Sequence, residues 1–189
     1  GKGVSGVVDG NIIKADMLLV SIGRKPVTGG LMLEKAGLAV TKTGHIEIDK
    51  YCQTKADGIF AVGDVTAGST QLAHAATAQG VAAAENASLS AMKPVETTIP
   101  ACIFTDPEIG LVGLTEQKAK ELGRKVKVGK FSFAALGKAL ASGENKGFVK
   151  WVADGDTDQL IGAQAVGAHA TELISEAATA VRAELTAGE

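Results

Sequence analysis

The chain has 189 residues, a length that fits one large domain or two small ones. It is 46% hydrophobic with a net charge of -2, so it can bury a core and lacks the basic character of nucleic-acid-binding proteins. No apolar run reaches the ~20 residues of a membrane span and no secretory signal opens the sequence, so we expect a cytoplasmic protein with no membrane partner. Cys52 and Cys102 lie far apart in the sequence and are expected to be reduced, buried thiols.

The first half of the sequence predicts several short elements and one long helix. Strands are expected over 4–8, 11–14, 17–22, 46–48 and 59–62, and helices over 31–36 and about 71–90. The turn pair Asp9-Gly10 favours a hairpin between the first two strands, and the continuous apolar run 17–22 is typical of a strand buried on both faces. The long helix is lined by alanine. Gly80 inside it costs about 1 kcal/mol relative to alanine, so we expect a close contact there.

The composition changes near residues 94–100, where we place a domain boundary. Beyond it, strands are expected over 101–104, 109–113, 126–133, 147–153 and 160–166, with helices after Thr115 and from about 170. Thr115 suits an N-cap and Gly123 suits the position after a helix C-terminus. The second half is therefore predicted to be an antiparallel sheet with two helices, an α+β unit.

The stretch 58–65 and the helix start at 71–74 carry the most functional information. Gly63-Asp64 follows a short apolar strand, and a carboxylate there can accept hydrogen bonds from a sugar-like hydroxyl. The helix start beside it offers free backbone N–H groups to an electron-rich ring or an anion. A flavin, with its ribitol chain and its pyrimidine edge, requires both features close together. The alternative for Asp64 is a structural role as a helix or loop cap.

The histidines give no sign of a metal site or a catalytic base. His74 has no second His, Cys or carboxylate at ligand spacing on its helix. We expect its backbone N–H to matter at the helix start, with local bonds for its imidazole. His45 follows a turn glycine, and His169 stands at a helix start with a capping or packing role. We therefore assign no metal.

Several motifs occur in order along nearly the whole chain, at 15–26, 58–65, 72–74, 104–115, 147–150 and 167–174. Together they resemble the C-terminal half of a flavin-dependent disulfide oxidoreductase, of the class I pyridine-nucleotide-disulfide oxidoreductase family. The helix start Leu72-Ala73-His74 is similar to that of the family's dihydrolipoyl dehydrogenase branch. Glutathione reductases usually carry Leu-Thr-Pro-Val-Ala there, and mercuric reductases an aromatic-rich version.

The resemblance implies roles for individual residues. Asp64, with Gly63, would bind the ribitol of FAD, and Gly23 would lie close to NAD. The backbone at the flavin pyrimidine edge would come from Gln71, Leu72, Ala73 and His74. Reduced flavin gathers negative charge at that edge, which a helix N-terminus stabilises.

The resemblance also implies a mixed α/β and α+β organisation in three parts. Residues 1–27 would be the tail of an NAD-binding domain, 28–97 the later part of an FAD-binding domain, and 98–189 a truncated interface domain. The interface domain would pair two subunits into a homodimer, and the parent enzyme would serve a 2-oxo acid dehydrogenase complex.

The family's redox-active Cys-x4-Cys pair and its catalytic histidine are not in this sequence, so we assign no catalytic residue. We expect a fragment that is inactive alone and has lost FAD and NAD. Its parent would oxidise dihydrolipoyl groups with both cofactors. The alternatives are a non-catalytic dimerisation module, or a fragment of a mercuric-type or other disulfide reductase.

Overall fold

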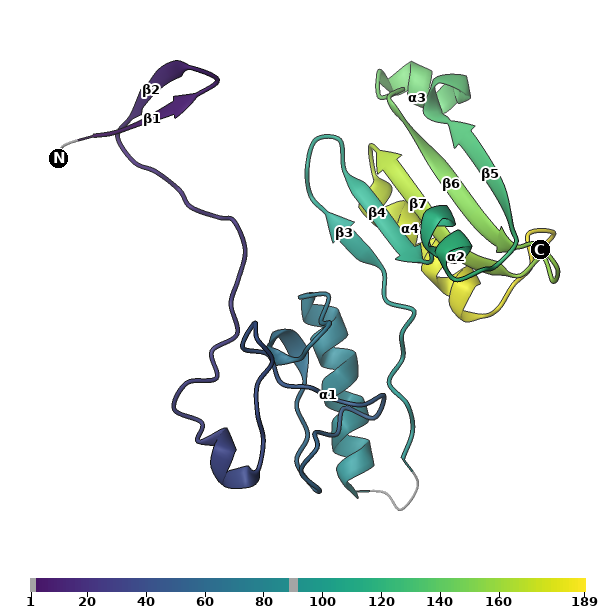
Figure 1. The fold of residues 1–189 in the computed structure, drawn as a ribbon. Helices are drawn as coiled ribbons and strands as arrows, with labels where there is room; N and C mark the ends of the chain where they lie inside the picture. The colour runs from purple at the N-terminus through teal and green to yellow at the C-terminus, as the bar shows by residue number, and fades with distance from the viewer. Residues whose placement is uncertain (1–2, 89–91) are drawn as a thin grey trace.

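The computed structural model describes residues 3–88 and 92–189, and its elements form two groups (Figure 1). The first group contains β1 (Val4–Val8), β2 (Asn11–Ala15), the 3-10 helices η1 (Leu33–Ala36) and η2 (Gly63–Val65), and α1 (Ala73–Ser88). The second contains β3 (Ala101–Ile103), β4 (Ile109–Gly113), α2 (Glu116–Glu121), β5 (Val126–Ser132), η3 (Phe133–Ala135), α3 (Gly137–Ser142), β6 (Gly147–Asp154), β7 (Leu160–Gly167) and α4 (Ala170–Arg182). Within these described ranges, none of the helices combines the length and the apolar character that a membrane crossing requires.

The second group is built on an antiparallel sheet with the strand order β3-β4-β7-β6-β5. All five strands, together with α2 and α4, lie where the sequence predicted them, so the α+β prediction is confirmed. Elements η3 and α3 were not predicted from the sequence. Helix α3 has 6 residues, which is too short to show a helical repeat of apolar positions.

Helices α4 and α2 pack on opposite faces of this sheet. Ile174 of α4 is buried against Val112, and Trp151 packs on the same cluster. Ala119 of α2 is buried against Val152, the residue after Trp151 on β6. Because successive residues of a strand point to opposite faces, the two helices cover different sides. This arrangement gives the second group a core on each face.

Turn and cap residues explain where several elements begin and end. Asp9 and Gly10 have φ values of 49° and 80°, as a two-residue hairpin turn with two positive φ angles requires. Thr115 accepts a hydrogen bond from the backbone N–H of Lys118 at 3.1 Å, which makes it the N-cap of α2. Gly123 follows α2 with φ at 75°. These three predictions are confirmed.

The predicted strand over 17–22 is wrong. The segment is extended between β2 and the rest of the first group (Figure 1) and has no strand partner among the described residues. Leu19 and Ile22 are 88% and 94% exposed. An apolar run becomes a buried strand only where other strands and helices cover it, and the described chain supplies none here.

The strands predicted over 46–48 and 59–62 are reduced to isolated bridges. Ile46 bridges to Val40 and to Thr66, and Phe60 bridges to Gln53. The remaining first-half predictions are closer to the structure. The helix expected over 31–36 is η1, and the long helix is α1, whose expected end at 90 lies outside the described residues.

Candidate functional site

Asp64 lies in η2, which is fastened to the side of α1. The backbone N–H of Gly63 donates a hydrogen bond to Oε1 of Gln79 at 2.6 Å. A Cβ atom at Gly63 would stand 3.2 Å from the Cβ of Ala76, so the backbone of η2 runs close to the helix. The segment that carries the carboxylate and helix α1 are therefore neighbours, as expected from the sequence.

Arg24 joins the carboxylate to the start of α1. Its Nη1 lies 2.7 Å from Oδ2 of Asp64, and its Nη2 donates to the backbone carbonyl of Gln71 at 2.6 Å. The side chains of Arg24 and Asp64 are 63% and 37% exposed. No role was predicted for Arg24 from the sequence, because residues so distant along the chain carry no spacing signal that relates them.

The Asp64 carboxylate keeps capacity to bind hydroxyl groups. A carboxylate offers about four lone-pair sites, and Arg24 is its one hydrogen-bonding or ion-pairing partner within 3–88 and 92–189, at Oδ2. Oδ1 is thus available, and the side chain is open to solvent. A polyol such as ribitol fits this acceptor, since its hydroxyls would donate hydrogen bonds to a charged oxygen.

The N-terminus of α1 presents backbone donors beside this carboxylate. The N–H of Ala76 donates to the carbonyl of Leu72, which is the first hydrogen bond of the helix. The N–H groups of 72–75 precede that bond and have no partner inside the helix. The first turn contains no acidic side chain to compete for them. Gln71 adopts φ at 56°, and its own N–H donates to Oγ of Ser69 at 3.1 Å.

His74 makes a bond to a distant residue. Its Nε2 lies 2.6 Å from the carbonyl oxygen of Pro100. A carbonyl can only accept, so Nε2 carries the proton and donates. The expectation of local bonds for this imidazole is therefore wrong, because the bond ties the start of α1 to the residue before β3. No group of three His, Cys, Asp or Glu residues in the described ranges could hold a metal ion.

Gly23 lies in the exposed stretch that follows β2. Its φ is 135°, a conformation that L side chains rarely adopt. No described atom lies within 4 Å of the place where its Cβ would be, so the space is open. A ligand could therefore approach the backbone of Gly23 closely.

The two cysteines are poor nucleophiles. Cys52 is buried and Cys102 is half-buried, and both are free. Burial raises the pKa of each thiol, and the charges of Asp49 and Glu108 respectively add to the effect. Since the thiolate is the reactive form, neither cysteine is suited to disulfide chemistry at neutral pH.

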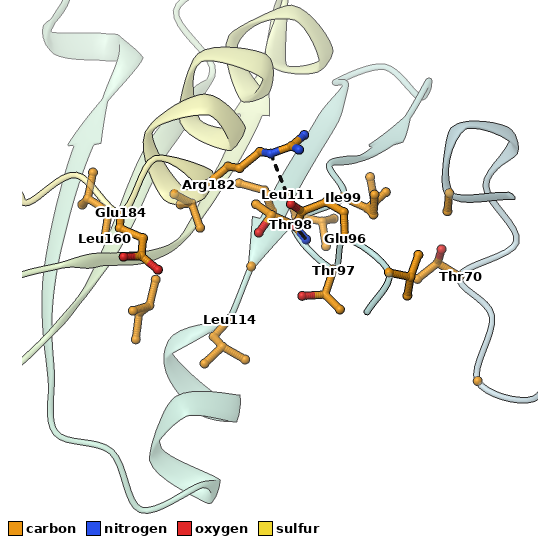
Figure 2. A pocket seen from close by; sticks show the side chains of 18 of the residues that line it. Thr70, Glu96, Thr97, Thr98, Ile99, Leu111, Leu114, Leu160, Arg182 and Glu184 are labelled. Atoms are coloured by element: carbon orange, nitrogen blue, oxygen red, sulfur yellow. Dashed lines mark hydrogen bonds and ion pairs between the residues drawn. The ribbon is translucent and has the colours of Figure 1, made fainter. Parts of the chain in front are cut away.

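A cavity of about 810 Å³ lies between the loop 68–70, the segment 95–99 and the second group. Figure 2 shows Arg182 reaching toward Glu96, with Nε and Oε2 3.2 Å apart. The pKa of Glu96 is lowered, mainly because the backbone N–H of Thr98 donates to it, with a smaller contribution from Arg182. The charges of this pair are already balanced, so they offer no reactive group.

Two family models match the chain. One, described as pyridine nucleotide-disulphide oxidoreductase, matches residues 5–80. The other, described as pyridine nucleotide-disulphide oxidoreductase, dimerisation domain, matches residues 99–189.

Curated relatives and solved structures are similar over most of the chain. A dihydrolipoyl dehydrogenase of Bacillus subtilis is 47% identical over 167 residues, which are 88% of this chain and 35% of that protein. One of Chlamydia muridarum is 42% identical over 179 residues, 95% of this chain and 38% of that protein. The crystal structure of LpdA from Mycobacterium tuberculosis has a TM-score of 0.87 and 32% identity, covering 100% of this chain and 41% of that one. The HOCl-induced flavoprotein disulfide reductase RclA from Escherichia coli has a TM-score of 0.81 and 28% identity, covering 97% of this chain and 42% of that one. The chain thus spans little more than a third of the length of these curated relatives.

Proposed function

Because the chain belongs to the pyridine nucleotide-disulphide oxidoreductase family, we propose that it is part of an NAD-linked dihydrolipoyl dehydrogenase. Such an enzyme oxidises a dihydrolipoyl dithiol and reduces NAD. FAD, when bound, supplies the two-electron carrier between the two. The names of the Bacillus and Chlamydia relatives support this choice of substrate.

Asp64 is the residue on which the proposal mainly rests. Its carboxylate has one oxygen held by Arg24 and the other available, beside the start of α1. In the proposed site this free oxygen accepts hydrogen bonds from the ribitol hydroxyls of FAD. Gly63 supports the site by letting η2 approach α1, and Gly23 leaves open space for NAD.

The start of α1 would hold the pyrimidine edge of the flavin. The backbone N–H groups of Leu72, Ala73 and His74 would face that edge and stabilise the negative charge that reduction places there. Gln71 would contribute differently, because its N–H is bonded to Ser69 and its carbonyl to Arg24. Its role is to fix the direction in which the helix begins.

The proposed division of the chain follows the family. Residues 1–27 belong to an NAD-binding domain, 28–97 to an FAD-binding domain, and 98–189 to the interface domain of a homodimer. The dimerisation model that matches 99–189 supports the last assignment. In the parent enzyme the homodimer would serve a 2-oxo acid dehydrogenase complex.

The 189-residue chain alone should not turn over dihydrolipoamide with NAD, because neither Cys52 nor Cys102 can form the required dithiol pair. Clear turnover by the pure chain would contradict this. The flavin site is best tested in a chimera, in which this chain replaces the matching part of the Bacillus subtilis relative.

The chimera should purify with bound flavin, and Asp64→Asn should weaken FAD binding about tenfold or more, because a charged acceptor of hydrogen bonds is lost. Asp57→Asn is the control, since Asp57 is another carboxylate of the first group and an asparagine oxygen can keep its hydrogen bond from Gln53. A colourless chimera, or equal affinities of the two variants, would contradict the proposed site.

A different disulfide substrate is the second candidate, because the RclA structure is that of a disulfide reductase. A flavin-containing chimera that reduces another disulfide but leaves dihydrolipoamide unoxidised would favour it. The non-catalytic alternative predicts dimers of the chain without any flavin role. Light scattering on the chain tests the dimer, and a monomer at high concentration would argue against it.

A further inference from the structure

Arg24 contacts both halves of the candidate flavin site with one guanidinium group. Nη1 reaches the carboxylate of Asp64, and Nη2 reaches the carbonyl of Gln71, 47 positions along the chain. We propose that Arg24 is a positioning residue for the cofactor, which sets the place of the Asp64 carboxylate relative to the N-terminus of α1. This inference rests on the proposed function.

The geometry requires a guanidinium rather than any positive charge. Arginine carries its donors in a rigid planar fork, so two acceptors bonded to it are held in a defined relation to each other. A lysine ammonium is a point charge on a flexible stem and would not fix two acceptors in this way. One contact alone would tether Asp64 without orienting it to the helix.

The other fastening of η2 does not fulfil this role. The bond from Gly63 to Gln79 joins α1 about two turns after the helix begins. It is made by the backbone N–H of Gly63, so it does not hold the Asp64 carboxylate. Among the described residues, Arg24 is the one that bonds to both Asp64 and the residue preceding Leu72. Its loss should therefore disturb the relation between the ribitol acceptor and the free N–H groups.

Arg24 also follows Gly23, the position proposed to lie near NAD. The segment that would approach NAD is thus tied to the carboxylate that would bind FAD. An exposed ion pair contributes little to global stability. The main effect of removing Arg24 should therefore be on local position and on cofactor binding, while the unfolding midpoint stays nearly constant.

The first experiment uses the 189-residue chain. Amide hydrogen exchange is compared for Arg24→Met, Arg24→Lys and the control Lys25→Met, which alters a neighbouring exposed cation. Arg24→Met should speed exchange of the hydrogen-bonded amides of Gly63, Thr66 and Ala76 about tenfold, as expected for a lost charge-assisted hydrogen bond, and Lys25→Met should not. Equal exchange in Arg24→Met and Lys25→Met would overturn the proposal.

The second experiment places the same variants in the flavin-binding chimera. Arg24→Met should weaken FAD binding about tenfold relative to Lys25→Met, and Arg24→Lys should restore less than half of the loss. Full rescue of FAD binding by Arg24→Lys would show that charge alone matters and would overturn the positioning role. A loss of overall stability in Arg24→Met that parallels the loss of FAD binding would also overturn it. An unsubstituted chimera without flavin would refute the proposed function itself. A flavin-binding chimera indifferent to Arg24→Met refutes only the role of Arg24.

Discussion

A Cβ atom on residue 63 would stand 3.2 Å from the Cβ of Ala76, so Gly63 and Ala76 set how closely η2 approaches α1. Gly63 also has φ at 76°, in the left-handed region. Gly63→Ala should therefore destabilise the first group by about 1–2 kcal/mol through backbone strain alone, with the contact to Ala76 adding to it. Chemical denaturation followed by circular dichroism measures the loss.

Gly80→Ala is the matched control on the same helix. No described atom lies within 4 Å of a Cβ at position 80, and the backbone there is helical. The expectation that a close contact explains Gly80 is therefore wrong for the described chain. Gly80→Ala should stabilise α1 by up to about 1 kcal/mol. If both alanine variants were destabilised alike, the packing of η2 on α1 would not be the cause.

The second group could be predicted from sequence because its strands pair with one another. Each strand finds its neighbour within residues 101–167, so local alternation and turn residues were sufficient. The first group differs because its apolar segments lack such partners among the described residues. Residues 17–22 have the composition of a buried strand, but composition does not supply the sheet that would bury them.

The candidate site was predicted in part. Asp64 and the start of α1 were singled out by a strand-end carboxylate followed by a helix start, which is a local pattern. Arg24 and the bond from His74 to Pro100 depend on tertiary contacts between distant segments. No periodicity or spacing in the sequence indicates them.

Gly110 lies on the face of β4 that meets α4, and it should not tolerate a side chain. A Cβ there would lie 2.5 Å from the carbonyl oxygen of Ala170 and 2.8 Å from the Cβ of Ile174. Gly110→Ala should cost about 1–3 kcal/mol, because α4 must move away from the sheet. Gly129→Ala on β5 is the control, since nothing lies within 4 Å of its Cβ position. Equal unfolding free energies for the two variants would contradict the close packing.

Glu108 should make the stability of α4 depend on pH. Its Oε2 accepts from the hydroxyl of Thr171 at 2.7 Å and from its backbone N–H at 3.1 Å. His169, the residue before the helix, makes no side-chain cap. The hydroxyl and the N–H of Thr171 lower the pKa of Glu108 from its usual 4.5, against the opposing effect of burial.

Because the folded pKa is the lower one, this carboxylate contributes its full stabilisation above pH 4.5 and loses it as the pH falls through the lowered value. Glu108→Gln should destabilise the chain at pH 7, and its difference from the wild type should shrink on acidification. Glu176→Gln, on the exposed side of α4, is the control and should show no such trend. A pH-independent difference for Glu108→Gln would count against the carboxylate cap.

Asp154, at the turn between β6 and β7, should titrate far below an ordinary aspartate. The backbone N–H groups of Asp156 and Thr157 donate to Oδ1, and Arg124 binds Oδ2 at 2.8 Å. Together they lower its pKa from 3.8 to about 2, with the backbone donors contributing most. Arg124→Gln should therefore raise this pKa only part of the way back. Carbon-detected NMR titration of the Asp154 carboxyl measures it, with Lys125→Gln as the control. A wild-type midpoint near 3.8, or full recovery in Arg124→Gln, would show that the turn does not hold the carboxylate as described.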